Sequence, residues 1–179
     1  MKRITISLLL LTLFIQSGVP DYPSQLDKKI TKHIRRLWKD REVKKEILHF
    51  KDSTLNIPDR SFYRLTSQDS LVGIMVINKA KGCHVGGCDG DGQNQMYEYF
   101  YYMVIYNPDL TIKNVKVLQY EPEYGYEIAA KRWLKKFAGT NGCELRYSHE
   151  IDAISGATIS GQSIVADVNN LCYLMEGML

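Results

Sequence analysis

The sequence predicts a single domain of the α+β class, with a mainly antiparallel, twisted sheet flanked by helices. Three observations support this prediction: a helical apolar pattern early in the chain, β-prone runs with short turns in the middle, and helical patterns near the end. Consecutive strands joined by short turns pair antiparallel. Strands and helices also occupy separate parts of the chain, which favours the α+β class over the α/β class, in which they alternate. The 179 residues are 45% hydrophobic and 24% charged, which suffices for one packed core.

The beginning of the chain has the features of a secretory signal peptide. Lys2 and Arg3 give it a basic start, and Ile4–Ile15 is a short apolar run. A membrane-spanning helix needs about 20 apolar residues, so this run is too short to cross a bilayer comfortably. The alternative is an uncleaved N-terminal anchor. We therefore expect an exported protein, located in the periplasm or on the outer face of the cytoplasmic membrane.

The charge balance gives no reason to expect a nucleic-acid partner. The chain has 23 basic and 20 acidic residues, a net charge of +3. Lys2 and Arg3 belong to the leader, and without them 21 basic residues face 20 acidic ones. A nearly neutral domain lacks the excess of positive charge that phosphate backbones attract.

An amphipathic helix is predicted over residues 24–40. Leu26, Ile30 and Ile34 recur at helical spacing, and lysines and arginines occupy the opposite face. Such a helix can lie on a membrane surface, or it can pack its apolar stripe on the domain as an ordinary surface helix; we favour the second interpretation. Residues 42–50 predict another short helix.

The middle of the chain predicts the sheet. Residues 62–65 and 71–78 are β-rich and are separated by a polar turn. The aromatic run 97–106 and the alternating run 111–120 predict a hairpin closed at Asn107-Pro108-Asp109. The aromatic side chains divide between the two faces of a strand, so we expect them to pack in the core.

The last third of the chain returns to helical patterns. Residues 126–137 predict a helix that ends before Gly139, and residues 143–152 predict a short strand. A final helix is expected from Ser160 or Gly161 to Met175, with Ser160 or Ser163 as its cap.

Four cysteines follow the leader. Cys83 and Cys88 flank the segment His-Val-Gly-Gly, and an exported protein favours a disulfide between them. Free thiols, or a metal held by Cys83, His84 and Cys88, are the alternatives, although this spacing is unusual for zinc. We predict no metal site. Cys172 lies in an apolar helical stretch, which predicts burial.

The stretch "DAISGATIS" near the C-terminus combines small and hydroxyl residues before the final helix. Thr158 is expected in a loop at the helix N-terminus, where unpaired N–H groups and the helix dipole favour a phosphate. Gly156 and Ala157 leave the hydroxyl unshielded. The pattern suits a phosphate near Thr158 and leaves open whether it is bound or bonded. An ordinary loop-to-helix junction has similar residues.

This stretch resembles the Ser-Gly-Ala-Thr signature of the FMN-binding domain in the C and G subunits of sodium-pumping NADH:quinone reductase and of the Rnf complex. The resemblance implies covalent FMN, joined through a phosphoester to Thr158. Ser155, Gly156, Ala157 and Asp152 match the surrounding recognition motif. It also implies a flavin transferase, dependent on FAD and magnesium, that attaches FMN outside the cytoplasm.

The resemblance covers residues 62–175. Glu121 and Gly125 match its Glu/Pro/Gly loop and are implied to bind the cofactor, although this chain lacks the Thr and first Gly of the common E-T-P-G-x-G form. We accordingly divide the chain into a signal peptide at 1–18, an N-terminal helical segment at 19–60 and an FMN-binding domain at 61–179.

The implied function is that of an electron carrier in a membrane-associated chain, with a membrane donor and an unknown acceptor. The residues suggest no hydrolytic machinery, and we predict no catalytic residue. His149 lies near the motif, where a surface role is favoured over tuning of the flavin. The alternatives are a secreted ligand-binding or structural module without flavin, and a flavin-dependent reductase.

Overall fold

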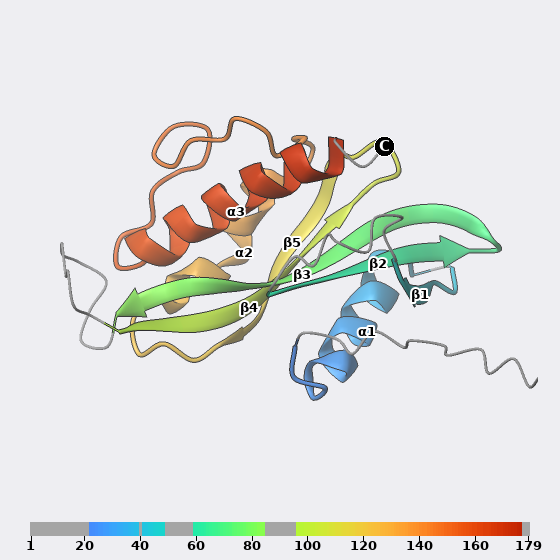
Figure 1. Cartoon of the computed structure of the whole chain (residues 1–179), viewed down its shortest axis with the longest axis horizontal. Coiled ribbons are helices and arrows are strands. Elements are labelled where there is room, and N and C mark those ends of the chain that lie inside the picture. The colour runs from blue at the N-terminus through green and yellow to red at the C-terminus, as the bar shows by residue number, and fades with distance from the viewer. Residues whose placement is uncertain (1–21, 40, 49–58, 85–95, 177–179) are drawn as a thin grey trace, which may run out of the picture.

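The computed structural model describes residues 22–39, 41–48, 59–84 and 96–176 (Figure 1). Within these ranges the chain forms five strands and several helical segments, of which the final helix is the longest. In chain order the elements are α1 (Leu26–Leu37), β1 (Lys44–Ile47), β2 (Arg60–Ser67), β3 (Ser70–His84), β4 (Tyr97–Tyr106), β5 (Ile112–Tyr120), the 3₁₀ turn η1 (Tyr126–Ala129), α2 (Lys131–Leu134), the 3₁₀ turn η2 (Lys135–Phe137) and α3 (Thr158–Glu176).

The strands form one antiparallel sheet in the order β1-β2-β3-β4-β5, so each strand pairs with its neighbours in sequence. Gln68 and Asp69 close the turn between β2 and β3 with φ angles of 49° and 61°. Positive φ at both turn residues is the conformation that continues the twist of a two-residue hairpin. The strands predicted at 62–65 and 71–78 and the hairpin predicted from 97–106 and 111–120 are confirmed.

Helices cover both faces of the sheet, as expected for this α+β fold. Alternate strand residues point to opposite faces, so Met75 and Met103 face α1 while Val76 and Val104 face α3. In Figure 1, α1 and α3 lie on opposite sides of the strands. Among the described residues, no helix combines the length and apolar character needed to cross a bilayer.

Helix α1 packs its apolar stripe on the sheet, as we favoured from the sequence. Leu26, Ile30 and Ile34 are buried in the core beneath the sheet. His33 also anchors the helix, because one ring nitrogen lies 2.7 Å from Oδ1 of Asn114 on β5. The lysines and arginines of the helix are consequently exposed.

The short helix predicted at residues 42–50 is wrong, because Lys44–Ile47 form strand β1. Lys45 pairs with Leu65 and Glu46 with Arg64 across the ladder to β2. Opposite charges facing each other on neighbouring strands favour this pairing. Residues 49 and 50 lie outside the described part. Non-local pairing has overridden the local helical pattern here.

The helix predicted at 126–137 is broken into η1, α2 and η2. Ala130 has extended backbone angles, φ −62° and ψ 119°, which interrupt the helical turns. Trp133 and Phe137 are still buried, whereas Tyr126 is exposed rather than part of the predicted apolar face. Gly139, with φ of +86°, ends the segment as predicted.

After Gly139 the chain returns to the free edge of β5. The N–H of Gly139 donates to the carbonyl of Ile112 at 2.8 Å, and the N–H of Ile112 donates to the carbonyl of Thr140 at 2.7 Å. The strand predicted at residues 143–152 is reduced to one isolated parallel bridge between Tyr147 and Ile151.

Candidate functional site

The Ser-Gly-Ala-Thr motif forms a tight turn directly before α3. The N–H of Ala157 donates to the carbonyl of Ile154 at 3.3 Å. Gly156, the third residue of this turn, has φ of +77°, a conformation that type II turns require and that glycine adopts without strain. Ser155 and Gly156 are exposed, whereas Ala157 is fully buried. The turn therefore presents its first two motif residues to solvent.

Thr158 is the first residue of α3, so the prediction that it lies in a loop before the helix is wrong, and the helix begins two or three residues before the predicted start at Ser160 or Gly161. The first helical bond runs from the N–H of Gly161 to the carbonyl of Ala157, at 2.8 Å. Helices leave their first N–H groups without intrahelical partners, and their positive dipole end lies there. Thr158 is half-buried, and the first turn contains no acidic residue. An anion is therefore electrostatically favoured beside Thr158.

Tyr147 holds this turn against the helix. Its hydroxyl accepts a hydrogen bond from the N–H of Ile154 at 2.8 Å. The ring packs on Gly161, where a Cβ atom would lie only 2.6 Å from Cε2 of Tyr147. The predicted cap role of Ser160 is wrong, because Ser160 lies inside the helix and is fully buried.

The Ser160 hydroxyl joins the first turn of α3 to the end of β5. Its Oγ lies 2.9 Å from the hydroxyl of Tyr120, which itself donates to the carbonyl of Tyr124 at 2.6 Å. Sγ of Cys83 lies 3.6 Å from the same Oγ. Burial raises the pKa of Tyr120, so its proton remains available for this bond. The loop after β5 is thereby tied to the start of α3.

Glu121 and Gly125 have described contacts within their own segment. The carboxylate of Glu121 is exposed and accepts a hydrogen bond from the Gln119 side chain. Gly125 is buried with φ of +86°, and its carbonyl accepts the N–H of Ile128. Gly125 thus shapes the entry into η1, and the described contacts bring neither residue to Thr158.

Glu127 is the acidic residue that the fold places beside the motif. A Cβ atom on Gly156 would lie 3.7–3.8 Å from the carboxyl atoms of Glu127. Its Oε2 is buried and has no hydrogen-bond partner among the described residues. Glu127 could not be identified from the sequence, because residues 126–137 predict a continuous helix, and its nearness to Gly125 was the signal available.

Asp152 fixes the approach to the turn. Its carbonyl accepts the indole N–H of Trp133 at 2.7 Å, and its Oδ2 lies 3.1 Å from Nζ of Lys136. Both ends of this ion pair are largely exposed, so its contribution to stability is small. His149 is exposed nearby. Of the motif residues, Asp152, Ser155 and Gly156 are therefore exposed, Thr158 is half-buried and Ala157 is buried.

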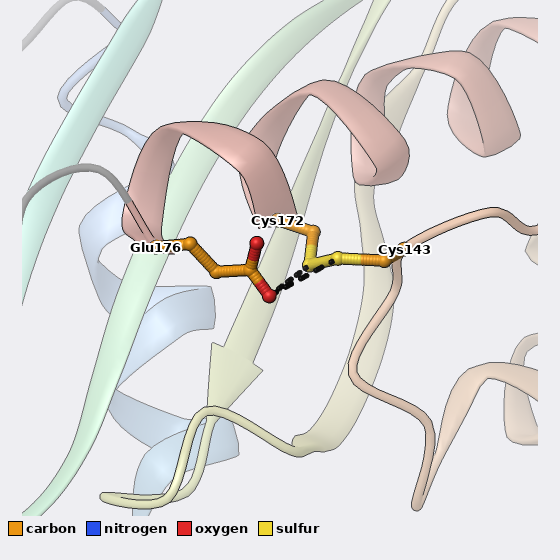
Figure 2. A group of neighbouring side chains, drawn as sticks. All are labelled: Cys143, Cys172 and Glu176. Atoms are coloured by element: carbon orange, nitrogen blue, oxygen red, sulfur yellow. Dashed lines mark hydrogen bonds between the residues drawn. A yellow bond between two sulfur atoms is a disulfide. The ribbon is translucent and has the colours of Figure 1, made fainter.

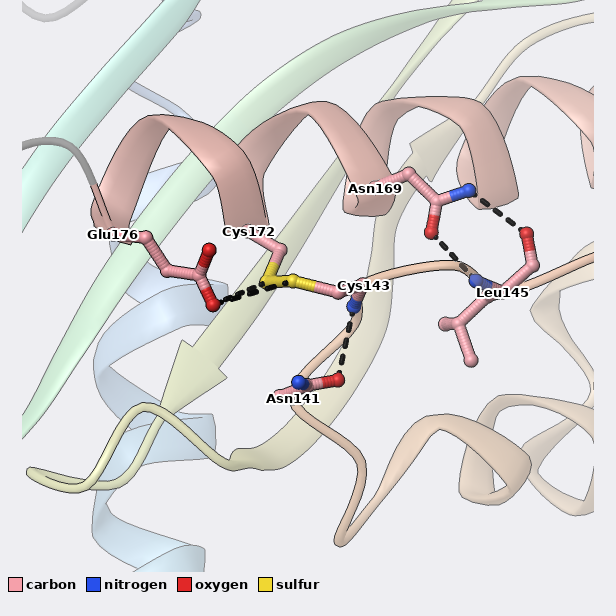
Figure 3. The surroundings of a disulfide bond; sticks show 6 residues. All are labelled: Asn141, Cys143, Leu145, Asn169, Cys172 and Glu176. Carbon is pink, nitrogen blue, oxygen red and sulfur yellow. Dashed lines mark hydrogen bonds between the residues drawn. A yellow bond between two sulfur atoms is a disulfide. The ribbon is translucent and has the colours of Figure 1, made fainter.

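A disulfide between Cys143 and Cys172 secures the loop before the motif to α3 (Figures 2 and 3). Asn169, one turn earlier on α3, accepts the N–H of Leu145 at 2.9 Å and donates to its carbonyl at 2.8 Å. Oε1 of Glu176 lies 3.6 Å from Sγ of Cys143. Disulfide sulfurs carry no proton and no thiolate charge, so these three side chains do not form a metal site.

The cysteine spacing predicted a disulfide between Cys83 and Cys88 and did not predict the Cys143–Cys172 pairing. The predicted burial of Cys172 is confirmed, since this residue is 4% exposed. Cys88 lies outside the described residues, so that bond stays a prediction.

Comparison with known proteins assigns this region to a family. Residues 98–172 match the family model of the FMN-binding domain, from β4 to the second half of α3. The match includes the turn, Tyr120 and Glu127, and it supports a flavin-binding protein with FMN as cofactor. A search of curated proteins found no match. The segment from residue 98 to residue 172 is thus a member of the FMN-binding domain family.

Proposed function

We propose that FMN is attached to Thr158 through a phosphoester and that the protein carries electrons outside the cytoplasm. The observation that carries this proposal is the position of Thr158, half-buried as the first residue of α3 and directly behind the exposed Ser155-Gly156 turn. A phosphate on its Oγ would lie at the positive end of a 19-residue helix.

The surroundings favour a covalent link over simple binding. The side chains with described contacts to the turn and the first helical turn belong to Tyr147, Tyr120, Cys83 and Glu127, none of which is a cation. Among these described contacts, a free phosphate would meet N–H and hydroxyl donors without a cation, and it would face the carboxylate of Glu127. A bond to Thr158 removes dissociation and keeps the local cofactor concentration high.

The attachment reaction balances with FAD as donor. The Oγ of Thr158 would form a bond to the phosphorus of the FMN half, the pyrophosphate bond of FAD would break, and AMP would leave with the electron pair. The hydroxyl proton would pass to a base of the magnesium-dependent flavin transferase that the family resemblance implies. Exposed Ser155 and Gly156 would let that enzyme approach the hydroxyl closely.

Export and electron transfer complete the proposal. The predicted signal peptide at 1–18 supports export, and the Cys143–Cys172 disulfide is typical of proteins outside the cytoplasm. When bound, FMN would supply the redox chemistry, and this chain would position it. A membrane donor would deliver electrons, and a further acceptor would take them.

A second candidate is a secreted module of the same fold that is never flavinylated. Oε2 of Glu127 lies near Gly156 without a hydrogen-bond partner among the described residues and favours this candidate, because a carboxylate there would repel a phosphate. A flavin-dependent reductase is the third candidate. Turnover of a small acceptor by the flavinylated protein would test it.

Co-expression with a flavin transferase in an exporting host tests the proposal. Wild-type protein denatured in acid should keep its yellow colour and show the mass of one added FMN less water. Thr158→Val should lose both, while Thr66→Val on β2 should keep both, and thermal unfolding should confirm that each variant folds. Wild-type protein that stays colourless, beside a transferase proven active on another acceptor, would refute the attachment and favour the module.

A further inference from the structure

Helix α1 and the neighbouring strand β5 together form a dense positive surface, which we call the basic face. Every α1 residue in this set is exposed, and the two β5 lysines are half-buried beside them. An open hollow along α1 is lined by Asp27 and Thr31 and otherwise by members of this set. The basic face consists of Lys28, Lys29, Lys32, Arg35 and Arg36 of α1, Lys39 just after α1, and Lys113 and Lys116 of β5.

The fold determines which side of α1 meets other molecules. The apolar stripe at Leu26, Ile30 and Ile34 is buried against the sheet, so it is not available to insert into a lipid layer. Lys29 is held in place, because its ammonium donates to the carbonyl of Leu118 on β5. Any partner of this surface therefore meets positive charge rather than a hydrophobic groove.

These cations lie close enough to repel one another. Burial, together with the charges of Lys29, Lys131 and Arg36, lowers the pKa of Lys116. The one carboxylate of the hollow, Asp27, is already engaged by Lys45 at 2.7 Å. A polyanionic surface would relieve this repulsion. Because the net charge of the whole chain is only +3, the clustering of cations on this face is a local feature and not a result of overall composition.

We propose that the basic face docks on the anionic surface of a phospholipid bilayer, with headgroup phosphates as its ligands. Charge complementarity is the first reason, since long flexible cations spread along one helix suit a diffuse anionic surface. Chain order is the second. The apolar run of the predicted leader ends at Ile15, shortly before α1 begins at Leu26, so a retained leader would keep α1 within about 35 Å of the membrane.

Docking in this way orients the domain. Helices α1 and α3 cover opposite faces of the sheet (Figure 1), so the start of α3, with Thr158, would face away from the bilayer. A flavin there would be open to a transferase or acceptor outside the membrane. The docking itself does not depend on the flavin, and its test is separate from the colour assay.

Vesicle flotation of the full chain tests the proposal. Wild-type protein should bind vesicles containing about one third phosphatidylglycerol, bind pure phosphatidylcholine much less, and be released as salt rises from about 0.1 M to about 0.5 M. The variant Lys28→Gln/Lys32→Gln/Arg35→Gln should bind anionic vesicles about 100-fold more weakly.

A matched control removes three exposed cations elsewhere, through Lys81→Gln/Arg132→Gln/Lys135→Gln. It changes net charge equally and should weaken binding only severalfold. All three proteins carry the same N-terminus, so any lipid affinity of the leader is common to them, and circular dichroism confirms that they fold.

Equal binding to neutral and anionic vesicles, or equal losses in the two triple variants, would overturn the proposal. So would capture by immobilised heparin without any vesicle binding, which would reassign the basic face to an acidic macromolecule. None of these results would bear on flavin attachment to Thr158.

Discussion

The Cys143–Cys172 disulfide closes a long loop, and its removal should be costly. The two residues are 29 positions apart in the sequence. The loop-closure relation for a cross-link of that span gives about 3.6 kcal/mol of stabilisation at room temperature. Most of this acts through the unfolded chain, whose freedom the bond restricts.

The variant Cys143→Ser/Cys172→Ala removes the bond with little new strain, since serine suits the half-exposed site and alanine the buried one. Its free energy of unfolding should fall by about 3.6 kcal/mol, which for a chain of this size lowers Tm by roughly 7–14 °C. Guanidinium and thermal unfolding, followed by circular dichroism, measure both quantities.

Reductant provides the control for this prediction. Reduced wild-type protein and the reduced variant should unfold at the same midpoint, because any effect on Cys83 is common to both. A loss below about 1 kcal/mol would refute the reasoning, since the loop constraint alone should exceed it. Such a result would mean that the bond restricts the unfolded chain far less than its span of 29 positions implies.

Three further predictions concern single positions. Gly156→Ala should cost about 1–2 kcal/mol in urea unfolding because of its φ of +77°, and Gly156→Asn should cost less; equal stability would exclude the left-handed turn. The hydrogen bond from Arg146 lowers the pKa of Glu150 from 4.5 to about 2. The stabilisation that this pair contributes is therefore present above pH 4.5 and is lost as the pH falls towards 2. Glu150→Gln should make the free energy of unfolding less dependent on pH across that window. Asn78 is buried with both amide atoms unpartnered among the described residues, so Asn78→Leu should stabilise the fold by about 1 kcal/mol or more, and a lower Tm would contradict this.

Local patterns in the sequence predicted most of the fold. The apolar stripe of α1 and the runs that became β2 to β5 depend on periodicity within one segment, which the sequence displays directly. Strand β1 could not be found this way, because Lys44–Ile47 is a strand only through pairing with β2. The break at Ala130 likewise reflects packing that residues 126–137 do not reveal by themselves.

The candidate site was predictable in its motif and not in its surroundings. The residues from Ser155 to Thr158 are consecutive, so the chain itself brings them together. Glu127 and Tyr147 reach the same turn only after the sheet and helices assemble. The Cys143–Cys172 pairing also joins distant parts of the chain, and residue spacing does not specify which cysteines meet.

The two outer strands of the sheet determine whether copies of this chain can associate by pairing their strand edges. An exposed strand edge is a template for pairing with a second molecule, and such pairing leads to aggregation. Here β1 is only four residues long and carries Lys44, Lys45 and Glu46, while the start of β5 is already paired with the backbone of Gly139 and Thr140. Short length and charge protect one edge and self-pairing protects part of the other, so the sheet is poorly suited to growth by strand addition.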